Sequence, residues 1–193
     1  MQLTRLWFIA LAMLPASIAR AQAIDDPLLS PFAPHHPARW LAPRAPSRLH
    51  GNSWLVGFGG LSVVLIDTGP GVILIDGAVP QAVPAIEANI RRLGFRVEDV
   101  EYILSTEPHF DHAGGVAALA RDSGATVVAS RAAAEVLRRG RSGPEDPQAA
   151  HLPQFPGGGG VGGAGSPAPT ARRSGSATPS SPLARRRGIR REA

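Results

Sequence analysis

The sequence predicts an α/β domain built in layers, with helices covering a sheet and functional residues at the strand ends. Two observations support this class. Residues 52–76 alternate apolar runs with glycine turns, as antiparallel strands do, and residues 84–139 alternate amphipathic helices with short strands. A chain of 193 residues is long enough for one domain with a substantial core.

The first part of the predicted sheet is a meander. Its apolar runs are rich in β-branched residues such as Val63, Val64 and Ile66, which favour strands. Glycine and proline mark the turns between the runs. The predicted strands cover residues 54–58, 61–67 and 72–76, with turns at 59–60 and 69–71.

The second part alternates helices and strands. Ile86, Ile90 and Leu93 share one face of a helix over residues 84–93, and Gly94 is placed to end it. Ser130 can cap a further helix. The remaining predicted elements are a strand over 100–104, a helix over 116–121, a strand over 126–129 and a helix over 131–139 that ends at Gly140.

A loop after the predicted strand 100–104 concentrates potential metal ligands. Glu107, His109, Asp111 and His112 place two carboxylates and two imidazoles within six positions. From an extended segment, residues 107, 109 and 111 point the same way, and His112 adds a donor as the chain turns. Gly114-Gly115 then allows a tight turn into the next helix. We predict a metal site for up to two adjacent ions; a surface cluster of His and Asp is the alternative.

These residue types suit zinc. The chain has no cysteine, so the ligands of a metal site must be His, Asp or Glu. Zinc held by imidazole and carboxylate lowers the pKa of a bound water to about 7, and a second ion stabilises the leaving group. The natural reaction is hydrolysis of an amide or ester, and we assign Asp111 the catalytic role of orienting the nucleophile. No motif marks a Ser, Cys or Lys nucleophile.

The first 23 residues are predicted to be a signal peptide. A basic start at residues 1–5 precedes a mostly apolar run at 6–18, and Ala21-Gln22-Ala23 fits the small-x-small cleavage rule. A transmembrane anchor is the alternative, but the apolar run is too short to cross a bilayer comfortably, and Pro15 interrupts it. We expect a periplasmic or secreted protein without membrane association after cleavage.

The net charge of +5 is unevenly distributed. Residues 24–150, the predicted domain, hold 11 arginines and 14 acidic residues, whereas residues 151–193 hold 7 arginines and one glutamate. This tail is rich in glycine, proline and serine, and we predict a low-complexity basic segment that is disordered from about residue 155. An arginine-rich arm for nucleic acid is the alternative. The aromatic residues that stack on bases are missing, so we expect no nucleic-acid partner.

Several motifs resemble one known family. His109-Phe110-Asp111-His112 resembles the second half of the H-x-H-x-D-H signature of the metallo-β-lactamase superfamily, and the family's Ala-Gly-Gly follows it. Residues 50–52, 59–62, 72–78 and 94–100 resemble zinc β-lactamases of the third subclass of class B. The resemblance runs from about residue 34 to residue 148.

The resemblance implies an αββα sandwich of which residues 24–150 form the N-terminal half. It also implies two zinc ions and hydrolysis of the amide bond of β-lactam antibiotics, an antibiotic-resistance activity on small-molecule substrates. A thioesterase or lactonase of the same superfamily would share the ligand loop. A third possibility is a catalytically inactive fragment that binds one zinc ion or none.

Transferred residue by residue, the resemblance makes His109 a ligand of the first zinc and makes Asp111 and His112 ligands of the second. Glu107 occupies the position of the family's first histidine and would be a ligand there. The family uses two further histidines from its second half, and the only histidine downstream is His151. The break in composition near residue 148 therefore suggests truncation or a shifted reading frame. The upstream histidines, which are predicted to be surface or loop residues, are His35, His36 and His50.

Overall fold

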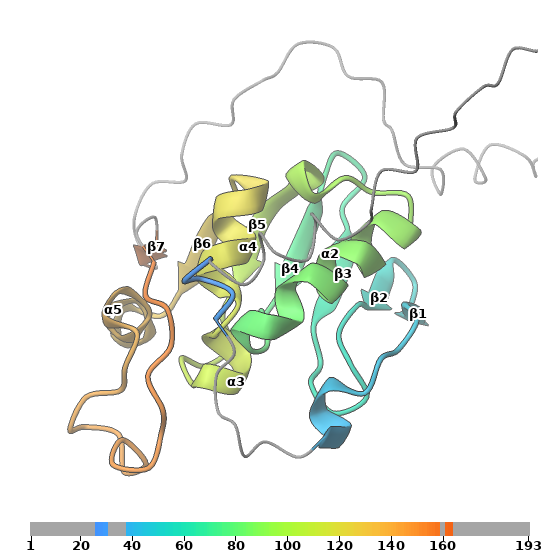
Figure 1. Ribbon diagram of the computed structural model, residues 1–193. Coiled ribbons are helices and arrows are strands. Elements are labelled where there is room, and N and C mark those ends of the chain that lie inside the picture. Colours follow the sequence, from blue (N-terminus) through green and yellow to red (C-terminus); the bar gives the residue numbers. More distant parts are fainter. Residues whose placement is uncertain (1–25, 31–37, 159–160, 164–193) are drawn as a thin grey trace, which may run out of the picture.

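The computed structural model describes residues 26–30, 38–158 and 161–163 (Figure 1). Within these residues the strands form one seven-stranded sheet in the order of the sequence. Strands β1 to β4 are antiparallel, and β4 to β7 are parallel. The strands are β1 (Ser47–His50), β2 (Ser53–Leu55), β3 (Val64–Asp67), β4 (Val72–Ile75), β5 (Val100–Leu104), β6 (Thr126–Ala129) and β7 (Val161–Gly163).

The helices join the parallel strands, which confirms the α/β class. Helices α2 and α4 lie in front of the sheet in Figure 1, and α5 lies beside β7. The predicted helix over residues 131–139 is confirmed, with the Ser130 hydroxyl accepting a hydrogen bond from the Ala133 amide. The helices are α2 (Val83–Arg92), α3 (Phe110–Ala113), α4 (Val116–Ser123) and α5 (Arg131–Arg139), with short 3-10 turns at Ala38–Leu41, Pro80–Ala82 and Val97–Asp99.

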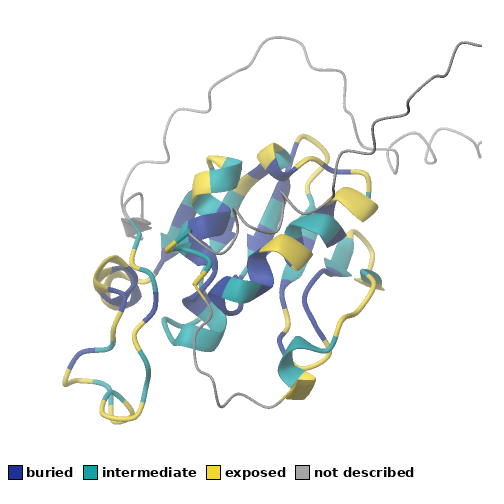
Figure 2. Ribbon diagram, in the orientation of Figure 1, coloured by how far each residue is buried: buried dark blue, intermediate teal, exposed yellow. Residues whose placement is uncertain are grey.

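The core lies between the sheet and the helices (Figure 2). Leu65, Leu74 and Ile103 are fully buried on successive strands and pack with Ile86 and Ile90 of α2 in one apolar cluster. Alternate residues of β3 to β6 are also apolar but only half-buried, and these include Ile66, Ile73, Ile75, Leu104 and Val128. Strands that are apolar on both faces are typical of a sheet with layers on both sides.

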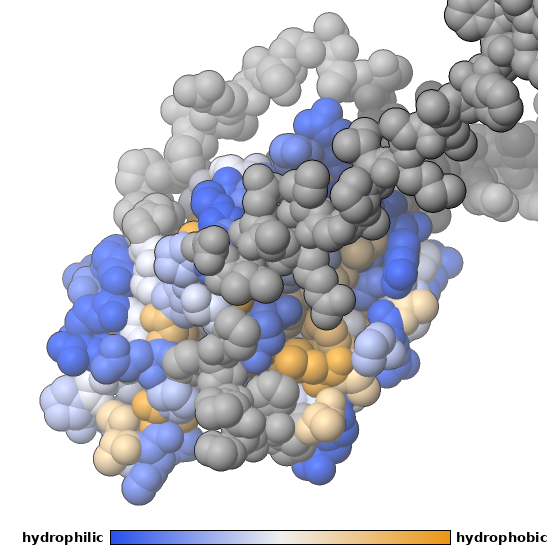
Figure 3. All heavy atoms as spheres, viewed as in Figure 1, coloured by the Kyte–Doolittle hydropathy of each residue, from blue (hydrophilic) through white to orange (hydrophobic). Residues whose placement is uncertain are grey.

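The outer surface on the helix side is mostly hydrophilic, with smaller hydrophobic patches between charged side chains (Figure 3). Arginines occupy the last turn of two helices, Arg91 and Arg92 in α2 and Arg138 and Arg139 in α5. Among the described residues, no helix is both long and apolar enough to cross a membrane.

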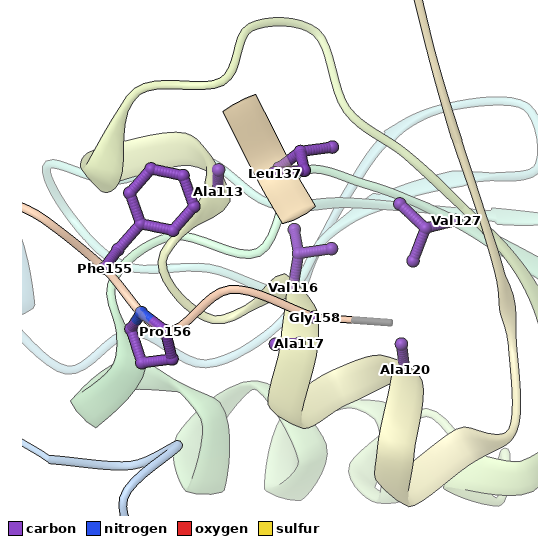
Figure 4. A pocket seen from close by; sticks show the side chains of 9 residues that line it. All are labelled: Ala113, Val116, Ala117, Ala120, Val127, Leu137, Phe155, Pro156 and Gly158. Carbon is purple, nitrogen blue, oxygen red and sulfur yellow. The ribbon is translucent and has the colours of Figure 1, made fainter. Parts of the chain in front are cut away.

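The segment after α5 differs from the sequence-based prediction. We expected disorder from about residue 155, but Phe155 is buried, and its amide donates a hydrogen bond to the Gly140 carbonyl. Strand β7 pairs with β6. The reason is that Phe155 packs into the apolar core, where it lines a small cavity of about 10 Å³ with Pro156 and residues of α4, α5 and β6 (Figure 4). The predicted signal peptide and residues 164–193 lie outside the described residues.

An ion pair joins the described N-terminal segment, residues 26–30, to α4. Arg121 Nη1 donates to Asp26 Oδ2 at 2.6 Å, and the Leu28 amide donates to Asp26 Oδ1 at 2.9 Å. The Arg121 guanidinium, and secondly the Leu28 amide, hold the pKa of Asp26 below its usual range. Leu28 and Leu29 then pack against the edge of the core.

Asp26→Asn is expected to lower the unfolding temperature near neutral pH and to lose this effect in acid. A carboxylate with a depressed pKa stabilises the fold above its unfolded-state pKa of about 4, and this contribution disappears as pH falls through the folded-state value. Thermal unfolding by circular dichroism, from neutral pH down to strong acid, measures the difference between the two proteins. In an Arg121→Gln background the difference should largely vanish, and its persistence there would contradict the assigned ion pair.

Candidate metal centre

The predicted ligand loop lies where three parallel strands end. Residues 105–112 follow β5, and the Ser105 amide donates to the Val128 carbonyl at 2.9 Å, which extends the pairing with β6. On the other side, the Asp76 amide donates to the Leu104 carbonyl at 2.8 Å. The end of β4 and the loop after β5 therefore meet at one edge of the sheet, the usual location of sites in α/β domains.

The loop is extended only as far as His109. His109 has extended backbone angles (φ −87°, ψ 155°), and its carbonyl accepts hydrogen bonds from the amides of His112 and Ala113. These bonds begin α3 at Phe110, so Asp111 and His112 lie on a helical turn. The prediction that residue 111 continues the alternation of 107 and 109 is therefore wrong.

The four predicted residues nevertheless lie close together, and both histidines face the Glu107 carboxylate. Its Oε2 lies 3.1 Å from His109 Nδ1, and its Oε1 lies 3.0 Å from His112 Nε2. Asp111 Oδ2 lies 3.9 Å from the same His112 nitrogen. All four side chains are partly exposed, with Glu107 the most accessible at 46%. A small ion can therefore reach them from solvent.

The donor chemistry fits zinc. Imidazole nitrogens and carboxylate oxygens bind zinc at about 2.0–2.2 Å, so two ligands of one tetrahedral ion lie about 3.3 Å apart. The 3.1 Å of Glu107–His109 and the 3.0 Å of Glu107–His112 are close to this spacing, whereas Asp111 lies farther from His112, at 3.9 Å. Across residues 26–30, 38–158 and 161–163, no group of three or more His, Cys, Asp or Glu is arranged to hold one ion. The described residues thus bring zinc-binding donors together in pairs, and the family resemblance assigns Glu107 to His109 and Asp111 to His112.

Asp76 is a site residue that the sequence reasoning missed. Its side chain is 8% exposed and accepts hydrogen bonds from the Thr106 amide at 2.8 Å and the Thr106 hydroxyl at 2.6 Å. Its Oδ2 also lies 2.9 Å from His112 Nδ1. This contact is the main reason that the pKa of His112 is raised, and the charges of Asp111 and Glu107 add to it. An acidic residue that ends an apolar strand, as in residues 72–76, was the available signal.

Asp146 was also missed. It lies in the turn after α5, and its Oδ2 is 3.0 Å from His109 Nε2. The Gln148 amide, and after it the Ser142 hydroxyl, hold the pKa of Asp146 below its usual range. Because 37 residues separate Asp146 from His109, no local sequence pattern links them.

The remaining histidines have no assigned role. His50 at the end of β1 and His151 in the turn after α5 are both exposed. The prediction of His50 as a surface residue is confirmed. His35 and His36 lie outside the described residues.

The two glycines after the ligand loop are needed for packing. Gly114 and Gly115 form the predicted turn into α4, with φ of −59° and −89°, which other residues also adopt easily. However, a Cβ on Gly115 would overlap the carbonyl oxygen of Gly77, and a Cβ on Gly77 would lie 2.8 Å from the Val116 amide nitrogen. The Gly77 amide donates to the His112 carbonyl at 2.7 Å across this contact. The glycines therefore let the end of β4 touch the ligand loop.

The fold is a mixed α/β sheet with helices, and a cluster of His and acidic residues lies where its parallel strands end. A model of the metallo-beta-lactamase superfamily matches residues 46–182, and the chain belongs to this superfamily. The match extends beyond residue 148, where the sequence resemblance was expected to stop. Enzymes of this family depend on zinc.

Solved structures of subclass B3 metallo-beta-lactamases are similar to this chain. One is a B3 metallo-beta-lactamase described as the first with an active-site glutamic acid; it is 57% identical, with a TM-score of 0.70, over 72% of this chain and 52% of that one. Rm3 metallo-beta-lactamase is 49% identical (TM-score 0.63; 65% and 47% covered). MEM-A1, a subclass B3 enzyme from a soil metagenome library, is 45% identical (TM-score 0.62; 64% and 47% covered). The chain thus spans about half the length of these proteins.

Proposed function

We propose that this chain carries the site of a zinc-dependent β-lactam hydrolase that acts in the periplasm or outside the cell. The observation that carries the proposal is the Glu107 carboxylate, which faces His109 Nδ1 at 3.1 Å and His112 Nε2 at 3.0 Å in the loop after β5. The 57% identity to a B3 metallo-beta-lactamase with an active-site glutamic acid supports a functional role for Glu107.

Each ligand pair has a distinct role in this proposal. Glu107 and His109 would hold one zinc ion, and Asp111 and His112 would hold a second. Zinc, when bound, supplies a Lewis acid and lowers the pKa of water to about 7. A carboxylate at position 107 brings negative charge to the first pair and should make that ion a weaker Lewis acid than an imidazole would.

The residues of the chain itself orient the reactants. Asp111 is 26% exposed and lies on the first turn of α3, so its carboxylate can accept a hydrogen bond from the water that attacks the lactam carbonyl. The buried Asp76 carboxylate fixes the ring of His112 from behind. Neither role needs a nucleophilic Ser or Cys, because water attacks the carbonyl directly.

Hydrolysis of nitrocefin by the purified chain in the presence of zinc tests the proposal. We expect hydrolysis that a chelator abolishes, that Asp111→Ala removes and that Asp67→Asn leaves intact, because Asp67 lies at the opposite end of the β3–β4 pair. Full activity in Asp111→Ala would contradict the assigned role. Preference for a thioester or lactone over nitrocefin would instead favour another hydrolase of the superfamily.

Zinc binding without hydrolysis is the second candidate, and the two-residue ligand pairs favour it. A competent two-zinc enzyme requires more than two protein ligands for each ion. Zinc content after dialysis distinguishes the candidates, since an enzyme should retain close to two ions and a weak binder one or none. Retention of zinc with no nitrocefin turnover would select this second candidate.

A further inference from the structure

Asp146 is the described residue outside the ligand loop that faces the second nitrogen of His109. Its Oδ2 lies 3.0 Å from His109 Nε2, and both side chains are largely shielded, with 18% and 20% of their surface exposed. We propose that Asp146 is a positioning residue: it fixes the ring orientation and the tautomer of His109, so that Nδ1 is presented to the metal. This inference rests on the proposed zinc site.

The contact with Asp146 determines which nitrogen of the His109 imidazole carries the proton. An ionised carboxylate only accepts hydrogen bonds, so the Asp146 contact requires a proton on His109 Nε2. In the neutral ring the other nitrogen, Nδ1, then carries the lone pair that can bind a metal. That nitrogen faces Glu107 Oε2 at 3.1 Å. The Asp146 contact has hydrogen-bond geometry, whereas the Glu107 contact is only an ion-pair distance, so the contact behind the ring selects the nitrogen that carries the proton and leaves Nδ1 as the ligand.

In the neighbouring His112, the roles of the two ring nitrogens are exchanged. Asp76 faces Nδ1 of His112 at 2.9 Å, which leaves Nε2 directed at Glu107 Oε1. Each ring therefore has one carboxylate behind it and presents its other nitrogen to the Glu107 carboxylate. Because Asp76 and Asp146 come from different elements, the two rings can be tested separately.

The Asp146 carboxylate is itself well fixed. Its Oδ1 accepts a hydrogen bond from the Gln148 amide at 2.8 Å, and its own amide donates to the Gly143 carbonyl at 3.0 Å. The base of this loop is closed by the Phe155–Gly140 hydrogen bond at 2.8 Å. The adjacent Glu145 differs, because its side chain is 63% exposed and pairs with Arg139 at 3.6 Å. Glu145 is therefore the matched control.

The test begins with the metal-free full chain. Two-bond proton–nitrogen correlation spectra near pH 8, where imidazole is mostly neutral, report the tautomer of His109. We expect an Nε2–H tautomer in the native chain and in Glu145→Ala, and a mixed or Nδ1–H tautomer in Asp146→Ala. Asp146→Asn should preserve the tautomer, because its amide oxygen can accept the same hydrogen bond. Asp146→Ser retains an acceptor for the Gln148 amide but is too short to reach His109, so it replaces the alanine variant if that chain does not fold.

Zinc binding is measured second, with zinc ions alone and a competing chelator. Loss of a carboxylate behind a ligating histidine typically weakens metal binding by about 10- to 100-fold, and we expect this loss in Asp146→Ala and Asp146→Ser. A native tautomer in a folded variant that lacks the carboxylate would overturn the inference, whether or not zinc binds. A changed tautomer in a chain that binds no zinc would support the positioning role and contradict the proposed zinc site.

Discussion

Asp76→Asn is expected to weaken zinc binding by about 10- to 100-fold and to lower the free energy of unfolding by about 1–3 kcal/mol. The native carboxylate accepts three hydrogen bonds, from two groups of Thr106 and from His112. Asparagine tolerates the left-handed backbone at this position (φ 64°) but offers only one acceptor oxygen. At least one of these partly buried hydrogen bonds is then lost.

The same substitution should change how stability depends on pH. Asp76 raises the pKa of His112 in the folded chain, so its contribution is fully present below the unfolded-state value of about 6.5 and is lost as pH rises through the folded-state value. Native and Asp76→Asn chains should therefore differ most in mildly acidic solution. Denaturant unfolding of metal-free protein, together with an NMR titration of His112, measures both effects.

Thr106→Val is the control for Asp76. It removes the hydroxyl that donates to Asp76 Oδ2 at 2.6 Å but leaves the His112 contact in place. We expect some loss of stability with His112 still titrating above its usual pKa. Asp76→Asn should lower the pKa of His112 and the zinc affinity. If both stayed at their native values, as expected for the pKa in Thr106→Val, the role of Asp76 behind the ring would be refuted.

Gly115→Ala is expected to destabilise the fold by about 1–3 kcal/mol, the usual cost of forcing extra atoms into a packed interior. The new methyl group would overlap the Gly77 carbonyl oxygen, which is a backbone atom and cannot rotate out of the way. The end of β4 must then move away from α4, which shifts Asp76 relative to His112. Chemical denaturation should show the loss of stability, and the His112 resonances should shift.

Gly124→Ala is the control for Gly115→Ala, because it strains the backbone conformation without creating an overlap in the core. Gly124 has φ of 74°, and a Cβ there would meet nothing within 4 Å. Its replacement should cost about 1 kcal/mol from the left-handed conformation alone and leave the His112 resonances unchanged. A Gly115→Ala chain with native stability and native His112 spectra would contradict the close contact.

Local structure was largely predictable. Strands 100–104 and 126–129 and the helix over 131–139 appear with the predicted bounds, because β-branched runs, a serine cap and a terminal glycine act within a few residues. The segment around Phe155 was not predicted. Its order comes from burial against α4, α5 and β6, which a low-complexity sequence does not reveal.

The sequence by itself determined the α/β class and the ligand loop with Glu107, His109, Asp111 and His112, because these features depend on residue type and short spacing. Only the tertiary structure decided which nitrogen of each histidine faces an aspartate and which faces Glu107. Asp76 and Asp146 reach the rings from 36 and 37 residues away. A hydrogen bond depends on distance and direction in space, and strand pairing and loop closure set both only after the chain has folded.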